Sequence, residues 1–244
     1  INESRNLSLI GRKEVFMGRA KFGVFGDGKE LPQIAMSKFF RNGDFRSGYY
    51  RDQTFMMAID QLNANQFFAQ LYAHTDIDFD PHSGGRQMNN HFGTRMLNSS
   101  GKWKTLTDMK NSASDVSCVS GQMPRIVGLG YASKLCRENK DLGKMHNFSI
   151  NGNEVIFGTI GDASTSEGHF WESINACGVL QIPVVMSIWD DGYGISVPSE
   201  YHTTRNDLSK VLSGFQRSSK NENGFELITV KAVSYTHLRA HETG

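Results

Sequence analysis

The sequence lacks the features of a membrane-bound, nucleic-acid-binding or zinc-stabilised protein. Its 26 Lys and Arg residues nearly balance its 25 Asp and Glu residues, and without a basic excess we expect no nucleic-acid partner. Its apolar runs fall far short of the roughly 20 residues that span a membrane, and no charged and then apolar leader follows Ile1. Its three cysteines have no CxxC spacing, which argues against structural zinc. These absences favour a cytoplasmic protein in a reducing compartment.

What the sequence does contain is enough apolar material for a folded core. Of its 244 residues, 38% are hydrophobic, which suffices for one large core or two small ones. Helical spacing predicts helices over residues 30–40, 53–62, 66–74 and 122–137, and residues 226–233 predict a strand. Periodicity fails over residues 78–117, and a stretch of that length is usually a functional loop or disordered. We expect a functional loop that closes over a bound group.

Residues 154–189 predict a strand, a helix and a second strand. Residues 154–160 are β-branched and apolar and end in a Gly-Asp-Ala-Ser turn, which is typical of a buried strand. The helix begins near Ser166, and Pro183 separates it from an apolar strand over residues 184–189. Its apolar stripe comprises Phe170, Ile174 and Cys177. Such a crossover joins parallel strands and collects ligands beyond their carboxyl ends, so the segment predicts an α/β fold.

Two carboxylates follow the predicted strands. Asp162 comes directly after the first strand, and Asp191 comes shortly after the second. A Mg²⁺ ion takes one or two protein carboxylates together with phosphate oxygens and water. The helix that follows Asp162 presents free N–H groups at its beginning, and these favour an anion. The arrangement therefore predicts a metal-bridged diphosphate.

The block from residue 161 to residue 196 resembles the thiamine diphosphate motif in the form carried by 2-oxoacid dehydrogenases. That motif begins Gly-Asp-Gly, ends Asn-Asn one strand–helix–strand unit later, and is followed by Gly-Tyr-x-Ile-Ser. Here Gly161-Asp162-Ala163 stands at its beginning and Asp190-Asp191 at its end. The chain thus departs from the motif in two places, because Ala163 replaces a glycine and Asp191 replaces an amide. The added negative charge of Asp191 calls for positive charge nearby.

The resemblance implies both a fold and a set of site residues. The fold is a doubly wound, mostly parallel sheet with helices on both faces. The implied metal ligands are Asp162, Asp191 and the backbone carbonyl of Tyr193. The implied contacts to the diphosphate are the backbone groups of Gly161, Ala163 and Ser164. The cofactors that follow are thiamine diphosphate and Mg²⁺.

Three earlier segments resemble the same family. The segment GYYRDQT looks like its Tyr-Arg segment, so Tyr50 would contact the thiamine and Arg51 would pair with the diphosphate; a permanently charged, forked guanidinium suits that task. The segment GGRQMNNHFG looks like its GRQMP-x-H-x-G stretch, and His91 there is a weak catalytic candidate. The segment SCVSGQMPRIVGLGYA resembles the stretch that cradles the aminopyrimidine, through Ser117 and Val119.

The activity implied by the resemblance is oxidative decarboxylation of a 2-oxoacid, either branched-chain or pyruvate, with transfer of the acyl group to a lipoyl arm. The implied partners are a lipoyl-bearing acyltransferase and a complementary beta-type half, in a homo- or hetero-oligomer. The chain looks most like the alpha-type half of the bacterial form in which both halves are fused. The Glu that activates the aminopyrimidine and the acid/base His are expected outside this chain, so we expect the chain alone to be inactive.

Other interpretations of the same residues stay open. The metal motif alone also fits another thiamine diphosphate enzyme such as a transketolase, and the two departures fit a non-catalytic diphosphate-binding module. Gly26-Asp27-Gly28 is a second literal Gly-Asp-Gly, but its distance from Asn89-Asn90 is about twice one crossover, so we interpret it as coincidence. We expect a cofactor-binding domain over 1–233, incomplete at both ends. Residues 234–244 resemble translated adapter sequence.

Overall fold

The structure, a computed structural model, describes residues 1–219 and 221–231. The chain divides into two compact units, each with its own buried residues. Unit 1 comprises residues 1–42 and 48–115, and unit 2 comprises residues 43–47 and 116–231. The adapter-like segment 234–244 lies outside the described residues, and a single cofactor-binding domain over 1–233 stays a prediction.

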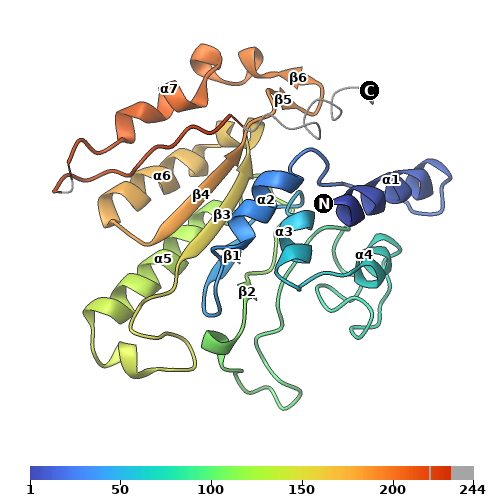
Figure 1. Cartoon of the computed structure of the whole chain (residues 1–244), viewed down its shortest axis with the longest axis horizontal. Coiled ribbons are helices and arrows are strands. Elements are labelled where there is room, and N and C mark those ends of the chain that lie inside the picture. Colours follow the sequence, from blue (N-terminus) through green and yellow to red (C-terminus); the bar gives the residue numbers. More distant parts are fainter. Residues whose placement is uncertain (220, 232–244) are drawn as a thin grey trace. The chain divides into compact units, whose positions relative to one another are not determined.

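Unit 2 is built on a parallel sheet. Its strands are β1 (Phe45–Ser47), β3 (Ile156–Gly161) and β4 (Val184–Trp189), in the order β1-β3-β4. Helices α5 (Gln122–Glu138) and α6 (Gly168–Leu180) pack against each other, and α5 also packs against β3 (Figure 1). The strand–helix–parallel strand unit formed by β3, α6 and β4 lies close to its predicted bounds. The parallel sheet with its helices confirms the predicted α/β class.

The core of unit 2 lies where α5 and α6 meet the sheet. Its buried members are Met123, Ile126, Ile156, Ile160, Phe170, Ile174 and Leu212. Helix α5 can approach the sheet closely because glycines lie at the contact. A Cβ atom added at Gly130 of α5 would lie 2.9 Å from Cγ2 of Val184, and one added at Gly158 of β3 would lie 2.6 Å from Cδ1 of Ile126. Gly128, on the same helix, faces open space.

The chain after β4 forms short elements. Strands β5 (Tyr193–Gly194) and β6 (Val197–Pro198) form an antiparallel hairpin, which leads into helix α7 (Leu208–Leu212). The short 3-10 turns of unit 2 are η2 (Leu142–Lys144), η3 (Ala163–Ser166), η4 (Ser199–Tyr201), η5 (Thr204–Asn206) and η6 (Ser213–Phe215). The predicted strand over 226–233 is wrong in its described part, because residues 226–231 join no ladder and only Phe225 bridges to Gln216.

Unit 1 is mainly helical. Its helices are α1 (Asn2–Phe16), α2 (Glu30–Ser37), α3 (Gln53–Ala58) and α4 (Ala64–Leu71), followed by η1 (Leu106–Asp108) and the short strand β2 (Asn111–Ser112). Helices α2, α3 and α4 were predicted with later ends, whereas α1 was not predicted. The side chains that α1 buries are small or polar except for one leucine: Ser4, Leu7, Ser8, Gly11 and Glu14. Among the described residues, no helix is both long and apolar enough to cross a bilayer.

The aperiodic stretch 78–117 is a packed loop. Apart from η1 and β2 it contains no helix or strand, as predicted, yet Asp80, Asn90 and His91 are buried in it. Burial alone would raise the pKa of Asp80, but hydrogen bonds from the backbone of Gly85 and from Ser83 lower it below its ordinary value. Hydrogen bonds to buried polar groups therefore help to give this loop its shape, together with buried apolar residues such as Phe92 and Leu106.

Candidate functional site

The carboxyl ends of β3 and β4 lie side by side, as the crossover requires. The register pairs Gly161 with Trp189, and the backbone N–H of Asp162 donates to the carbonyl of Trp189 at 3.3 Å. Asp162 and Asp190 therefore begin the two turns that leave this edge of the sheet. Asp191 follows one residue later. This is the edge at which parallel α/β sheets bind ligands.

Asp162 is the buried acid of this edge. Asp162 is only 3% exposed, and its Oδ2 has no hydrogen-bond partner among the described residues. Burial, together with the negative charges of Asp191 and Asp190, raises the pKa of Asp162 to about 6. A buried carboxylate beside two other acids is stabilised by a cation. This orphaned oxygen and its acidic neighbours fit a divalent metal.

The turn after β4 arranges the other implied ligands. Oδ1 of Asp190 accepts from the N–H of Gly192 at 3.1 Å, and Oδ1 of Asp191 accepts from the N–H of Tyr193 at 3.3 Å. Gly192 has φ of +79°, a conformation that suits glycine. Asp191 is thus tied to its own turn, and the backbone of Tyr193 lies two residues beyond it.

The protein ligands at this edge are few. Within the part of the chain that the structure describes, no group of three His, Cys, Asp or Glu side chains could hold a metal by itself. A magnesium ion that also binds phosphate oxygens needs only one or two carboxylates, because it keeps near-octahedral coordination with phosphate and water. The donor set therefore fits a metal held jointly with a diphosphate, and does not fit a cage made of protein alone.

The segment after β3 presents backbone groups at the same edge. The hydroxyl of Thr165 donates to the carbonyl of Asp162 at 2.6 Å, and the hydroxyl of Ser120 donates to the carbonyl of Ser164. The φ of Ala163 is not positive, so alanine is unstrained where the motif has glycine. A Cβ atom added at Gly194 would lie 2.7 Å from that of Ala163, so the hairpin β5–β6 lies against this turn.

A small cavity opens beside Asp162. Its volume is about 40 Å³, and its lining is polar except for Leu208: Asp162, Asp190, Ser199, Thr203, Asn206, Asp207 and Leu208. That volume holds about one water molecule or ion. The polar lining contrasts with the apolar core on the other side of β3 and suits a charged occupant.

The predicted aminopyrimidine contacts lie in the segment that leads into α5. Ser117 and the side chain of Val119 are exposed, Val119 by 53%. The Val119 carbonyl lies 2.9 Å from Nε2 of His169 at the start of α6. This contact joins the segment to the helix that follows the Asp162 turn.

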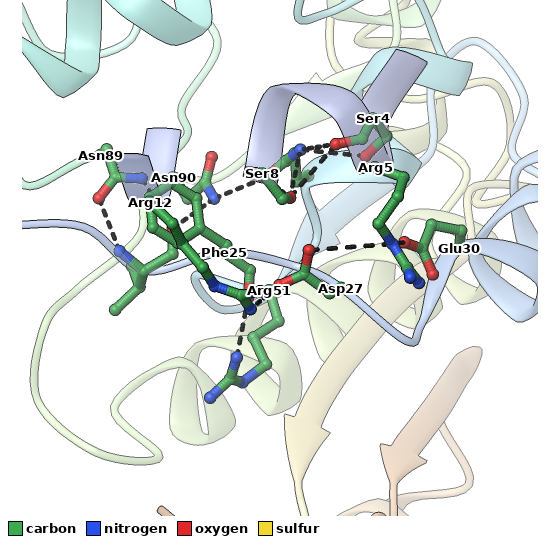
Figure 2. Close-up of polar contacts among 12 residues, drawn as sticks. Ser4, Arg5, Ser8, Arg12, Phe25, Asp27, Glu30, Arg51, Asn89 and Asn90 are labelled. Carbon is green, nitrogen blue, oxygen red and sulfur yellow. Dashed lines mark hydrogen bonds and ion pairs between the residues drawn. The ribbon is translucent and has the colours of Figure 1, made fainter. Parts of the chain in front are cut away.

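The remaining predicted residues belong to unit 1, where Tyr50, Arg51 and His91 lie together. The rings of Tyr50 and His91 stack at 6.3 Å, and the Arg51 guanidinium lies 5.4 Å from the centre of the Tyr50 ring. Nη1 of Arg51 donates to the carbonyl of Phe25 at 2.8 Å, as Figure 2 shows. The Arg51 carbonyl accepts from Nε2 of Gln33 at 2.8 Å. Arg51 is thus fixed at its backbone and at one nitrogen.

Comparisons with known proteins identify the family of the chain. The sequence profile of the family described as dehydrogenase E1 component matches residues 5–236. The chain belongs to the dehydrogenase E1 component family.

The relatives described below are all named as alpha subunits of 2-oxoisovalerate dehydrogenase. The 2-oxoisovalerate dehydrogenase subunit alpha of Bacillus subtilis is 28% identical over 225 residues, which cover 91% of this chain and 59% of that protein. The human mitochondrial 2-oxoisovalerate dehydrogenase subunit alpha is 25% identical, over 87% of this chain and 41% of that protein. The Arabidopsis thaliana mitochondrial subunit alpha 1 is 27% identical, over 73% and 31%. The chain thus spans between about a third and three fifths of these relatives' lengths.

Membership confirms the resemblance to the first component of 2-oxoacid dehydrogenases, and this family depends on thiamine diphosphate. The roles assigned to individual residues stay predictions. One sheet edge of unit 2 carries Asp162, Ala163, Asp191 and Tyr193 with their neighbours. The other predicted residues, Tyr50, Arg51 and His91, belong to unit 1.

The second Gly-Asp-Gly of this E1 chain has a different environment. Asp27 is 8% exposed, and its carboxylate pairs with Arg12 and lies 3.9 Å from Nε of Arg5, which also bonds Glu30 at 2.6 Å (Figure 2). Two arginines therefore already neutralise this acid. The sequence analysis missed this ion-pair group, because helix α1, which carries Arg5 and Arg12, was not predicted.

Proposed function

We propose that this chain is the alpha-type part of a thiamine diphosphate-dependent enzyme that decarboxylates a 2-oxoacid oxidatively and passes the acyl group to a lipoyl group. The observation that carries the proposal is the buried Asp162 carboxylate at the neighbouring carboxyl ends of β3 and β4, in a chain that matches the E1 family. Its Oδ2 has no hydrogen-bond partner among the described residues. The names of the relatives favour a branched-chain 2-oxoacid such as 2-oxoisovalerate.

The metal in this proposal is Mg²⁺. The carboxylates of Asp162 and Asp191 and the carbonyl of Tyr193 would hold it, and two diphosphate oxygens would complete much of its shell. The raised pKa of Asp162 reflects burial among acids, and a bound cation removes that penalty. The acidic residues at this edge therefore favour the state in which Mg²⁺ is bound.

The protein's own share of the chemistry is binding and orientation. Thiamine diphosphate, when bound, supplies a carbanion that adds to the keto carbon and an electron sink for the loss of CO₂. The Asp162 turn and the backbone of Ala163 and Ser164 would fix the diphosphate. None of these residues transfers a proton in this scheme.

The partners belong to the same proposal. A complementary beta-type half would supply the catalytic groups that this chain lacks, and a lipoyl-bearing acyltransferase would accept the acyl group. The relatives are named as alpha subunits, which supports an assembly with a second chain or half. We place the protein in the cytoplasm, in line with its three free cysteines.

The test of the proposal is a calorimetric titration of the chain with thiamine diphosphate in the presence of Mg²⁺. Binding is expected for the wild type and strongly weakened binding for Asp162→Ala, because the variant loses the buried ligand. Asp141→Ala, which removes an exposed acid of unit 2, serves as the control and should bind like the wild type. Unchanged binding in Asp162→Ala would refute the assignment of the motif.

The reaction itself needs the complementary half. Mixed with a beta-type subunit, the chain is expected to release CO₂ from 2-oxoisovalerate and not to act on a ketose phosphate. Turnover of the ketose phosphate alone would point to a transketolase instead.

A further inference from the structure

The imidazole of His202 lies in a fixed position next to the Asp162 turn. His202 follows η4, and its backbone N–H donates to the carbonyl of Ser199 at 3.1 Å. Its own carbonyl accepts from the hydroxyl of Ser166, the last residue of η3, at 2.8 Å. Nδ1 of its ring lies 2.8 Å from the hydroxyl oxygen of Thr203. These three contacts hold both the backbone and the ring.

The other ring nitrogen has no partner. Nε2 of His202 is buried and forms no hydrogen bond with any described residue. A buried polar atom left in this state costs free energy, so such atoms usually have a ligand, an ion or a water as their partner. This nitrogen is therefore able to form a hydrogen bond with a bound group.

Nε2 lies beside the turn that carries Ala163. A Cβ atom added at Gly194 would lie 3.9 Å from Nε2 of His202 and 2.7 Å from the Cβ of Ala163, so both atoms lie close to Gly194. The positive charge of His202 also lowers the pKa of Asp162, against the larger effects of burial and the neighbouring acids. An orphaned nitrogen and an orphaned carboxylate oxygen thus share one edge of unit 2.

The chemistry of the two orphans differs. Oδ2 of Asp162 is an acceptor that suits a cation. When the Thr203 hydroxyl donates to Nδ1, the ring proton resides on Nε2, and in the charged imidazolium Nε2 also carries a proton. In both of these forms Nε2 is a donor that suits an anionic oxygen, whereas the neutral tautomer that donates from Nδ1 to Thr203 leaves Nε2 an acceptor. A metal ion alone satisfies only the carboxylate, whereas a metal-bound diphosphate satisfies both.

We propose that Nε2 of His202 donates a hydrogen bond to an oxygen of the diphosphate that the Asp162 turn binds. The inference rests on the proposed function and adds a binding residue to it, outside the motif. In its charged form the ring also adds positive charge near Asp162, whose pKa that charge lowers.

The test compares His202→Ala with the wild type in two titrations. The first measures the dissociation constant of thiamine diphosphate, and of inorganic pyrophosphate, at saturating Mg²⁺. The second measures binding of Mn²⁺ alone by electron paramagnetic resonance. Loss of a hydrogen bond to a charged group should weaken the first two ligands roughly 10- to 100-fold and leave Mn²⁺ binding nearly unchanged.

Control variants separate this effect from general damage. His146→Ala removes an exposed histidine of unit 2 and should bind all three ligands like the wild type. His202→Gln keeps a side-chain N–H donor and should recover much of the lost affinity. If His202→Ala does not fold, as judged by circular dichroism, Thr203→Val removes the partner of Nδ1 and should weaken pyrophosphate binding several-fold.

Two results would overturn the inference while leaving the proposed function intact. One is wild-type affinity for pyrophosphate in a folded His202→Ala protein, provided that Asp162→Ala has lost binding. The other is an equal loss for Mn²⁺ alone, which would mean that His202 acts on the carboxylates and not on the diphosphate. If the wild type binds no thiamine diphosphate, the proposed function itself fails, and the inference fails with it.

Discussion

Replacing Asp162 by Asn should stabilise the metal-free protein at neutral pH. Asn keeps an oxygen that can accept from the backbone but removes a charge that is buried among like charges. Burial, Asp191 and Asp190 raise the pKa of Asp162 from 3.8 to about 6, while the N–H of Ala163 and the charge of His202 oppose the rise. The folded state therefore binds a proton more tightly than the unfolded state does.

The direction of the pH effect follows from this difference. An acid with a raised pKa in the folded state contributes a penalty that is absent below about pH 4 and grows as the pH rises to about 6. A shift of roughly two units corresponds to about 3 kcal/mol at most. Because the neighbouring cavity and the exposed turn admit solvent, which screens the charges, we expect about 1–2 kcal/mol.

The assay is urea unfolding at pH 4.5 and pH 7.5 in the presence of a chelator. The free energy of unfolding should fall by about 1–2 kcal/mol more in the wild type than in Asp162→Asn between these pH values. Asp141→Asn, at an exposed position, should follow the wild type. Adding Mg²⁺ and pyrophosphate at pH 7.5 should reverse the order, because the charged carboxylate then has its cation. Parallel pH profiles of the wild type and Asp162→Asn would refute the reasoning.

Three further predictions concern the frame around the site. Gly130→Ala should lower the free energy of unfolding by about 1–3 kcal/mol, because the added methyl group would overpack the contact between α5 and β4. Gly128→Ala, on the open side of the same helix, should raise the free energy of unfolding by about 0.5–1 kcal/mol. Urea unfolding of the two variants checks both signs. Burial raises the pKa of Cys177 to about 11, so a thiol reagent at pH 8 should label the exposed Cys118 well before Cys177, as mass spectrometry of timed samples can show; equal rates would contradict this. Gln33→Ala should lower the free energy of unfolding by about 1–3 kcal/mol, since the buried N–H of Phe55 and the half-buried carbonyl of Arg51 lose their partner; an unchanged melting temperature would speak against that role.

The crossover unit could be predicted from the sequence because each of its signals is local. An apolar run, a turn rich in small residues, an apolar stripe at helical spacing and a proline follow one another over residues 154–189, and the structure places β3, α6 and β4 accordingly. The position of Asp162 at the strand end follows from the same pattern. Its lack of a partner does not, because that depends on what the later turns bring near it.

Other elements could not be predicted for physical reasons. The face that α1 buries includes Ser4, Ser8 and Gly11, and Gln53 donates to both serines, so an apolar stripe never marks the helix. The apolar run after residue 226 has β propensity, yet no neighbouring strand is paired with it in the described chain. His202 lies in a segment without any motif, and only the tertiary contacts with Ser166 and Gly194 reveal its place.

The contact between Ala163 and Gly194 means that these two positions share room for a single methyl group. Alanine at the first position obliges the second to remain without a side chain, and a homologue that carries glycine at the first is free to bear alanine at the second. In this chain Gly194→Ala alone should therefore be destabilising, whereas the double substitution Ala163→Gly with Gly194→Ala should be tolerated.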